Sequence, residues 1–306
     1  MQGRIVSVNI AAEKGEKKSP VPAALLVAGQ GVEGDAHAGG ERQVSLLAEE
    51  AIKRCIARGV DVGAGDFGEN LTVAGFEPTS AAIGQRLLAG PTAILQVSQI
   101  GKICPQPCSI GRRLGDCIMP REGVFARVLR GGRVATGDAV TPTTIKVGAV
   151  LTASDRCARG ERQDESGPAL VRLLEELEVA AADYTILPDE EDQIRSYLAF
   201  LADRCGVDVV LTTGGTGLAP RDRTPEATLS LLDTQAPGIA EALRAEGMRH
   251  TSYACLSRGV SGLRGRTVII NLPGSKAAIE EVSPVLRVVL PHLLETLRGE
   301  GLGHGH

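Results

Sequence analysis

The sequence VVLTTGGTGLAPRDRTPE, residues 209–226, constrains the fold of this chain more than any other stretch. Three apolar residues of strand character lead into two threonines, and Gly214, Gly215 and Gly217 follow within four positions. Glycines at a strand end let backbone N–H groups approach an anion without an intervening Cβ, and the Thr-Pro pair that follows announces a helix whose positive end points the same way. The stretch therefore predicts a strand that ends at a phosphate-sized site.

An ordinary turn between a strand and a helix is the simplest interpretation of a bare Gly-Gly-Thr-Gly. The stretch is neither a Walker loop, which requires Gly-Lys-Ser/Thr, nor a dinucleotide-binding fingerprint, which spaces its glycines more widely. The whole string is more specific, since TTGGTG is followed by four residues, Asp222, one residue and Thr-Pro-Glu. This string resembles the signature of the MogA/MoaB family of molybdopterin-binding proteins.

The composition sets limits on the organisation of the chain and on its partners. A length of 306 residues is enough for two domains, each with its own core. The formal charge of -4 and an aromatic content of 2% without Trp argue against a nucleic-acid surface and against stacking platforms for single strands. We expect no nucleic-acid partner.

The number of cysteines, the first residues and the apolar runs indicate where in the cell the protein is located. The seven cysteines are an odd number, and the first residues, MQGRIVSVNI, lack the features of a signal peptide. No apolar run approaches the length of a membrane span, which is about 18 residues. We expect a soluble, cytoplasmic protein with no membrane association.

Residues 1–144 read as a β-rich domain, either a barrel or a sandwich. Short apolar or alternating runs are separated by glycine-containing turns. They predict strands near residues 4–10, 43–47, 70–73, 93–98 and 125–129. One amphipathic helix is predicted at 49–58, where Ala51, Ile52, Cys55 and Ile56 fall on neighbouring turns.

Five fragments in residues 1–144 are more specific than the apolar and turn residues that any β-barrel needs. They are GDAHAGG (34–40), GDFGENLTV (65–73), IGQRLLAG (83–90), QIGKICPQPC (99–108) and GVFARVLRGGRVATGDAV (123–140). In this order they resemble a MOSC domain, the module found at the C-terminus of molybdenum cofactor sulfurases. The resemblance implies that Cys104 is the thiol that carries sulfur or contacts molybdenum, and that the domain binds molybdenum cofactor.

The thiol assignment has alternatives. A thiolate is a soft ligand suited to molybdenum and to sulfur transfer, but free Cys is also a common small core residue, the interpretation we favour for Cys55. Cys104 and Cys108 are four residues apart, and either can be the family cysteine or half of a zinc site that lacks a second pair. Further pocket candidates in this half are His37, Arg42, Glu69 and Asn70.

Residues 145–306 predict a second domain of the α/β class. The connector Thr-Pro-Thr-Thr at 141–144 ends the first domain, and strands then alternate with helices. Strands are predicted at 146–152, 184–187, 208–213 and 267–272, with helices near 167–178, 193–202, 225–232, 238–249 and 276–297. This alternation indicates a mostly parallel sheet with its ligand site at the carboxyl ends of the strands.

Polar residues follow four of these strand ends. They are Ser154-Asp155-Arg156, Pro188-Asp189-Glu190, the glycine loop with Asp222, and Asn271-Leu272-Pro273-Gly274-Ser275. Each has an ordinary explanation, such as helix capping or a surface ion pair, but four in one sheet predict a single polar crevice. All four also match the MogA/MoaB pattern of SDR, PDE, TTGGTG with its Asp, and LPG.

The MogA/MoaB resemblance implies a molybdopterin adenylyltransferase that uses ATP and Mg²⁺ and releases pyrophosphate. Asp189 and Asp222 are the candidates for catalysis and for holding Mg²⁺, because Mg²⁺ often takes only one or two carboxylates beside phosphate oxygens. Candidate ligand-binding residues are Ser154, Asp155, Gly214, Gly215, Thr216, Gly217, Pro273, Gly274 and Ser275, with Arg221 and Arg223 offsetting charge.

The same resemblance implies a homotrimer formed through the second domain. It also suggests protein partners such as a molybdate-insertion protein, a sulfur donor or molybdoenzymes. The main alternative is a carrier or scaffold that binds molybdopterin without turnover, although two carboxylates facing an anionic ligand favour a metal-dependent enzyme.

Overall fold

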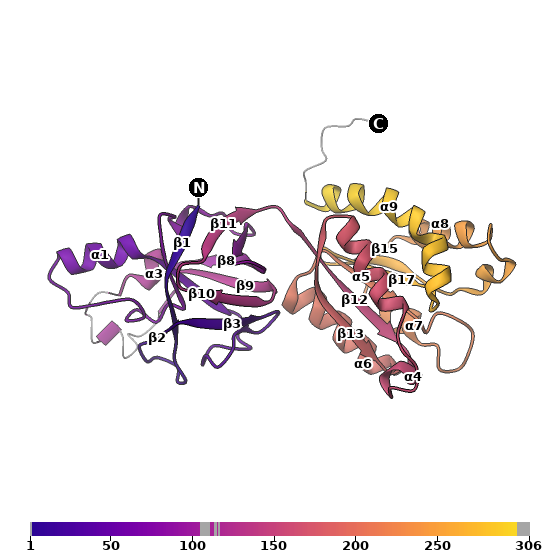
Figure 1. Ribbon diagram of the computed structural model, residues 1–306, viewed down its shortest axis with the longest axis horizontal. Coiled ribbons are helices and arrows are strands. Elements are labelled where there is room, and N and C mark those ends of the chain that lie inside the picture. The colour runs from indigo at the N-terminus through magenta and orange to yellow at the C-terminus, as the bar shows by residue number, and fades with distance from the viewer. Residues whose placement is uncertain (1, 105–110, 113–114, 116, 299–306) are drawn as a thin grey trace. The chain divides into compact units, whose positions relative to one another are not determined.

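The computed structural model describes residues 2–104, 111–112, 115 and 117–298. They form two compact units that divide between Thr144 and Ile145. Figure 1 colours the first unit indigo to magenta and the second through orange to yellow. Across the described residues, no helix combines the length and the hydropathy that crossing a membrane requires.

Within the described residues, seven strands of the first unit close into a barrel in the order β11-β7-β8-β9-β5-β6-β1, and β1 returns to β11 through the pairs Gly3–Val140 and Arg4–Ala139. Their bounds are β1 (Gly3–Ile10), β5 (Val44–Ala48), β6 (Leu71–Ala74), β7 (Arg86–Ala89), β8 (Ala93–Ile100), β9 (Val124–Arg130) and β11 (Ala139–Thr143). Strand β2 (Ser19–Val21) extends the sheet beside β1, and β3 (Ala23–Val27), β4 (Gly31–Val32) and β10 (Gly132–Ala135) form a smaller sheet. The predicted β-rich domain is confirmed as a barrel.

Helix α1 (Glu49–Ala57) covers an apolar cluster at the barrel, because its residues Ala51, Ile52 and Cys55 are buried together with Phe67. Its bounds agree with the predicted helix, and Cys55 packs as a core residue. Two shorter helical segments of this unit are η1 (Pro78–Ser80) and α3 (Met119–Glu122).

The second unit is a six-stranded sheet in the order β13-β12-β14-β17-β16-β15. The first four strands, β13 (Val179–Leu187), β12 (Lys146–Ala153), β14 (Val209–Thr213) and β17 (Thr267–Leu272), are parallel. Strands β16 (Ser261–Arg264) and β15 (Thr234–Gln235) add an antiparallel edge. The predicted α/β class and parallel core are confirmed, and the antiparallel edge is an addition that the sequence patterns did not predict.

Helices cover both faces of this sheet. Helices α5 (Ser166–Glu176), α8 (Pro237–Gly247) and α9 (Lys276–Arg298) share one apolar cluster with Val150, Leu211 and Ile270 of the strands. The residues next to these in each strand, such as Leu151 and Val210, are buried on the opposite face because side chains alternate along a strand. That face belongs to α6 (Glu191–Ala199) and α7 (Thr224–Leu229), which pack against each other. The remaining segments are α4 (Asp155–Ala158), the π-helical η2 (Phe200–Cys205) and η3 (Ser252–Leu256).

Strand β13 begins at Val179, five residues before the predicted start. Its first half reads Val-Ala-Ala-Ala, and alanine has little intrinsic preference for strands. Pairing with β12 from Lys146–Val179 onward supplies the partner that makes these residues a strand.

The first unit also contains a buried ion pair. Lys18 Nζ lies 2.5 Å from Asp35 Oδ2, and the two side chains are 2% and 0% exposed. Asp35 also accepts hydrogen bonds from the backbone N–H groups of Ala11 and His37 and from Asn70 Nδ2 at 3.1 Å. Burial lowers the pKa of Lys18, and its hydrogen bond to Asp35 opposes this shift. The pair is compensated only while both partners are present.

Glu69 lies beside this pair and is fully buried. Its Oε1 accepts hydrogen bonds from the backbone N–H of Gly65 at 2.6 Å and from Thr72 Oγ1 at 2.8 Å, while Oε2 has no hydrogen-bond partner in the part of the chain that the structure describes. Burial raises the pKa of Glu69. These groups form a buried polar network in the first unit.

We predict that Lys18→Met destabilises the first unit by about 3–5 kcal/mol, because it leaves the Asp35 carboxylate buried without its cation. Urea unfolding followed by circular dichroism measures this free energy. The matched control is Lys17→Met at the neighbouring exposed position, where we expect a change within about 0.5 kcal/mol. A loss below about 1 kcal/mol for Lys18→Met would show that the ion pair does not support the fold.

Candidate active site

The carboxyl ends of the four parallel strands meet at one edge of the second sheet. Ala153 of β12 pairs with Leu187 of β13, and Thr213 of β14 pairs with Thr152 and Leu272 on its two sides. The polar segments that follow these strands therefore begin level with one another. The four predicted segments lie around a single edge, which is where ligands of open parallel sheets bind.

The glycine loop after β14 packs closely against the end of β12. Gly214 has φ +90°, and a Cβ there would lie 2.2 Å from the carbonyl oxygen of Ala153. Gly215 has φ +61°, and a Cβ there would lie 2.4 Å from Thr224 Oγ1 and 3.1 Å from Asp189 Oδ1. Both the backbone conformation and the lack of space require glycine at these two positions.

Two further hydrogen bonds join the turn after β17 to the end of β14 and to the start of α5. Thr213 Oγ1 donates to the carbonyl oxygen of Pro273 at 2.6 Å, and Ser166 Oγ donates to that of Gly274 at 3.0 Å. A Cβ on Gly274 would lie 3.2 Å from the Cα of Gly214, so the two glycine turns are in direct contact. Residues from three distant parts of the chain thus form one backbone surface.

Arg258 holds the segment that carries Asp222. Its guanidinium donates to the carbonyl oxygens of Gly217 and Asp222, each at 2.7 Å, and it also pairs with Glu226. The side chain thereby joins the glycine loop to the start of α7. No sequence pattern singles out Arg258, because a lone arginine in the loop before β16 belongs to no motif.

Asp155 and Asp189 form reciprocal hydrogen bonds at the ends of neighbouring strands. The N–H of Asp155 donates to Asp189 Oδ2 at 2.8 Å, and the N–H of Asp189 donates to Asp155 Oδ1 at 3.1 Å. Arg221 donates two hydrogen bonds to the Asp155 carboxylate, at 2.9 and 3.1 Å, and contacts Glu190 at 2.8 Å. Asp155 is thus engaged by its neighbours, whereas Asp189 keeps Oδ1 toward the glycine loop.

These surroundings shift the two carboxyl pKa values in opposite directions. Burial raises the pKa of Asp189, and the nearby negative charges of Asp155 and Asp222 raise it further. The hydrogen bonds from Arg221 lower the pKa of Asp155. Neighbouring carboxylates that repel each other are stabilised by a cation placed between them.

Asp222 approaches the same site from the far end of the loop. Its Oδ2 accepts a hydrogen bond from the N–H of Ala219 at 2.8 Å, and a Cβ on Gly217 would lie 2.8 Å from that oxygen. The described residues contain no group of three or more His, Cys, Asp or Glu side chains arranged for a metal ion. The two carboxylates Asp189 and Asp222 fit Mg²⁺, which is often bound by one or two protein carboxylates with the remaining positions on phosphate and water.

Two pockets meet at this loop and share Gly214, Gly215, Asp222 and Gly274. The smaller has a volume of about 210 Å³ and is lined by polar residues that include Ser154, Asp164, Ser166 and Asp189. Thr152 also lines it and is 4% exposed, and within the described residues its Oγ1 has no hydrogen-bond partner.

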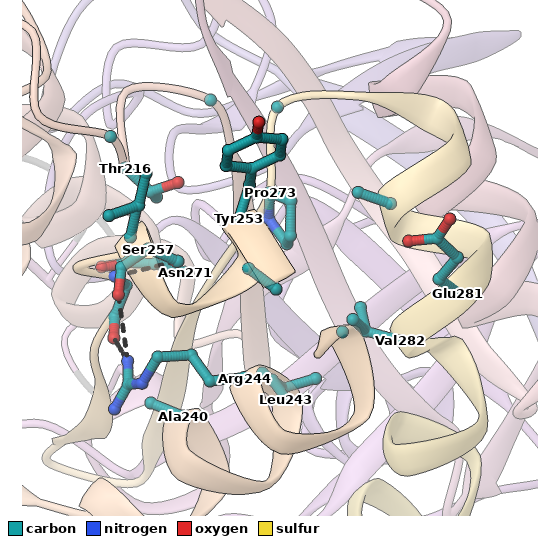
Figure 2. Close-up of a pocket in the computed structure, with 18 of the residues that line it drawn as sticks. Thr216, Ala240, Leu243, Arg244, Tyr253, Ser257, Asn271, Pro273, Glu281 and Val282 are labelled. Carbon is teal, nitrogen blue, oxygen red and sulfur yellow. Dashed lines mark hydrogen bonds between the residues drawn. The ribbon is translucent and has the colours of Figure 1, made fainter. Parts of the chain in front are cut away.

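The larger pocket has a volume of about 420 Å³ and lies toward α8, η3 and α9, as Figure 2 shows. Thr216, Gly217 and Pro273 line it. The site therefore offers a polar compartment and a more apolar one on either side of the glycine loop.

Two of the predicted serines cap helices. Ser154 Oγ accepts a hydrogen bond from the N–H of Cys157 at 3.3 Å and begins α4, while also lining the polar pocket. Ser275 Oγ accepts one from the N–H of Ala278 at 3.2 Å before α9 and lines neither of the two pockets. Asp155 likewise lines neither of them, so its contact with the site runs through Asp189 and Arg221.

The candidate residues of the first unit fall into two groups. Glu69 and Asn70 belong to the buried network, and His37 Nδ1 lies 3.2 Å from Asp35 Oδ1. Arg42 lies over the ring of Phe125 at 5.4 Å from its centroid, and Lys102 lies over the same ring at 6.0 Å.

Cys104 is exposed, and Cys108 lies outside the described residues. Sequence patterns did not identify Lys18 and Asp35.

We predict that Gly215→Ala costs clearly more stability than Gly265→Ala. Gly265 has a similar φ of +56° but nothing within 4 Å of a Cβ. The control variant Gly265→Ala is therefore destabilised only by the left-handed backbone conformation, which costs about 1–2 kcal/mol. Gly215→Ala must in addition displace Thr224 and Asp189. Urea unfolding of the two variants measures the difference, and equal losses would contradict the close approach.

Both units match known protein families. The model for the probable molybdopterin binding domain matches residues 149–295, and that for the MOSC domain matches 33–141. The molybdopterin adenylyltransferase of Helicobacter pylori (strain J99) is 39% identical over 158 residues, which are 51% of this chain and 89% of that protein. The molybdenum cofactor synthesis protein cinnamon of Drosophila melanogaster is 43% identical over 149 residues, but these are 48% of this chain and only 25% of that protein.

Among solved structures, the molybdopterin biosynthesis enzyme MoaB of Thermus thermophilus is 49% identical, with a TM-score of 0.48, and the match covers 50% of this chain and 97% of that one. The two resemblances predicted from sequence motifs are confirmed. The chain belongs to the MogA/MoaB family of molybdopterin-binding proteins through its second unit, and it carries a MOSC domain in its first.

Proposed function

We propose that the second unit catalyses the Mg²⁺- and ATP-dependent adenylylation of molybdopterin, giving adenylyl-molybdopterin and pyrophosphate. The observation that carries this proposal is the meeting of Asp189 and Asp222 in one polar pocket beside the glycine loop. The name of the Helicobacter pylori relative, a molybdopterin adenylyltransferase, supports the reaction class. A pyrophosphate assay with molybdopterin, ATP and Mg²⁺ tests the proposal directly.

The reaction joins the terminal phosphate of molybdopterin to the α-phosphorus of ATP, and pyrophosphate leaves. Transfer of this kind depends on positioning and charge neutralisation more than on covalent help from the protein. Asp189 and Asp222 would hold Mg²⁺, which neutralises phosphate charge when bound. The N–H groups of the glycine loop and the Thr216 hydroxyl would bind phosphate oxygens, with the residues after β12 and β17 completing the walls.

The raised pKa of Asp189 is consistent with this role. A carboxylate that is held near other carboxylates and partly removed from water binds a divalent cation more favourably than it remains charged alone. Arg221 offsets part of the negative charge from the Asp155 side of the site. Neither Arg221 nor Arg223 lines either pocket, so any effect of their charge reaches the site through neighbouring residues.

The alternative is a carrier that binds molybdopterin without turnover. Such a protein has no need for two carboxylates beside an anionic ligand, because without a metal they repel it. Molybdopterin binding without pyrophosphate release by the wild-type protein would favour the carrier.

We predict that Asp222→Asn and Asp189→Asn each lower the rate of pyrophosphate release by about 10²–10³-fold, because the amide removes a charge that positions the cation and the phosphates. Binding of molybdopterin should persist in both variants. Asp192→Asn on the exposed face of α6 is the matched control, and its rate should equal that of the wild type. Near-normal turnover in either site variant would contradict the catalytic assignment.

For the first unit we propose a MOSC module that binds, carries or sulfurates the cofactor, with Cys104 as its thiol. Cys104 is exposed, as a thiol that exchanges sulfur must be. The sulfur would come from a separate donor protein, and a molybdate-insertion protein and molybdoenzymes are the further partners that we propose. We also propose a cytoplasmic location and a homotrimer formed through the second unit.

We predict that Cys104→Ser leaves pyrophosphate release unchanged, because the thiol belongs to a different unit from Asp189 and Asp222. It should abolish sulfur loading of the first unit, measured by mass spectrometry after incubation with a persulfide donor, since a hydroxyl is a hard and scarcely ionised replacement. Cys255→Ser, at another exposed cysteine, is the control for nonspecific labelling. Normal loading of Cys104→Ser, with loading lost in Cys108→Ser, would move the assignment to Cys108.

A further inference from the structure

The polar pocket beside the glycine loop contains one positively charged side chain among several carboxylates. The carboxylates of its lining are Asp164, Glu165, Asp189 and Asp222. Among the described residues, Arg162 is the single arginine or lysine of that lining. Carboxylates repel a polyphosphate, and Mg²⁺ neutralises only part of the charge that the two bring together. A further cation is therefore needed where the triphosphate of ATP lies, and Arg162 is the side chain placed to provide it.

Other arginines near this edge of the sheet are already engaged. Arg221 pairs with Asp155, and Arg258 pairs with Glu226 and donates to backbone carbonyl oxygens. Neither arginine lines the polar pocket. Arg162, by contrast, is exposed and has no hydrogen bond or ion pair in the part of the chain that the structure describes. Its guanidinium therefore keeps its N–H donors for a ligand.

The backbone on both sides of Arg162 is held by hydrogen bonds. Before it, the N–H of Glu161 donates to the carbonyl oxygen of Arg156 at 2.9 Å. After it, Asp164 Oδ1 accepts a hydrogen bond from the N–H of Ser166 at 2.9 Å, at the start of α5. Because the segment is fixed at these two points, binding a phosphate orders little more than the arginine side chain.

We propose that Arg162 binds the β- and γ-phosphates of ATP and stabilises the pyrophosphate that leaves, which makes it a further catalytic residue of the second unit. This inference rests on the proposed function and adds a substrate contact to it. Arg162 lines the polar pocket and not the larger one, whereas Gly214 and Gly215 line both. With the α-phosphate at the shared glycine loop, the two outer phosphates extend into the polar pocket toward the exposed guanidinium.

The chemical step gives a reason for a guanidinium at this position. An oxygen of the molybdopterin phosphate forms a bond to the α-phosphorus, and the bond from this phosphorus to the oxygen that bridges to the β-phosphate breaks. The electron pair of the broken bond stays on that oxygen, so negative charge grows on the departing pyrophosphate. A guanidinium donates two parallel N–H bonds to phosphate oxygens and keeps its charge, so it stabilises the leaving group without a proton transfer.

The test uses the full chain and three probes, pyrophosphate, ATP and AMP, each with Mg²⁺, and measures their binding by calorimetry. Molybdopterin is left out, so no transfer takes place and only binding is measured. We expect Arg162→Gln to weaken the binding of pyrophosphate and of ATP about ten- to hundredfold, because hydrogen bonds between two charged groups are lost. AMP lacks the outer phosphates, so its affinity should stay within about twofold. Arg162→Lys should recover part of the loss, because it keeps the charge but not the parallel pair of donors.

Arg159→Gln is the matched control, because Arg159 lies in the same segment, carries the same charge and pairs with Glu161 outside the lining of the polar pocket. Its affinities should match those of the wild type. Equal losses in Arg162→Gln and Arg159→Gln would indicate a general effect of charge and overturn the assignment. Unchanged binding of pyrophosphate and ATP to Arg162→Gln, or an equal loss of AMP binding, would overturn it too.

The binding measurements also separate this inference from the proposed function. A wild-type protein that binds pyrophosphate through Arg162 but releases none from molybdopterin and ATP would refute the proposed function while supporting this inference. Pyrophosphate release by the wild type that Arg162→Gln leaves unchanged, together with unchanged binding, would support the proposed function and refute the role of Arg162.

Discussion

The close approach of the glycine loop to the end of β12 is the constraint on which the rest of the site depends. With a Cβ at Gly214 only 2.2 Å from the Ala153 carbonyl oxygen, any other residue would push the loop away from the sheet. The loop would then lose its contact with Gly274 and its shared wall between the two pockets. Chain geometry at two residues thus sets the distance between groups that are far apart in sequence.

Arginines balance the acidic character of this edge of the sheet in two different ways. Arg221 is more than half exposed and pairs with Asp155 and Glu190, so water screens its contribution to stability. Arg258 is less exposed and donates to two backbone carbonyls, and these bonds fix the path of the chain that carries Asp222. The first arginine tunes charge beside Asp189, whereas the second positions backbone.

The two units place their charged side chains in different surroundings. The first unit buries the Lys18–Asp35 pair and Glu69, and the two charges of the pair depend on each other because burial removes them from bulk solvent. The open sheet of the second unit places its carboxylates at a solvent-facing edge, where a cation or phosphate can reach them. The position of the carboxylates in the second unit follows from topology, because an open parallel sheet binds its ligands at the carboxyl ends of its strands.

Sequence by itself determined the α/β class of the second unit, the β-rich class of the first and most element positions, because strand and helix periodicities are local properties of the chain. It also determined that Gly214, Gly215, Asp189 and Asp222 belong near one another, since residues that follow parallel strands must meet at one edge. Tertiary structure alone decided the closure of the barrel, the antiparallel strands β15 and β16, and the start of β13 at Val179, because each needs a partner strand from elsewhere in the chain. It alone also revealed Arg258, the Lys18–Asp35 pair, and the position of Arg162 in the polar pocket. Single residues of these types carry no periodicity or motif, and their roles arise only from the neighbours that folding brings to them.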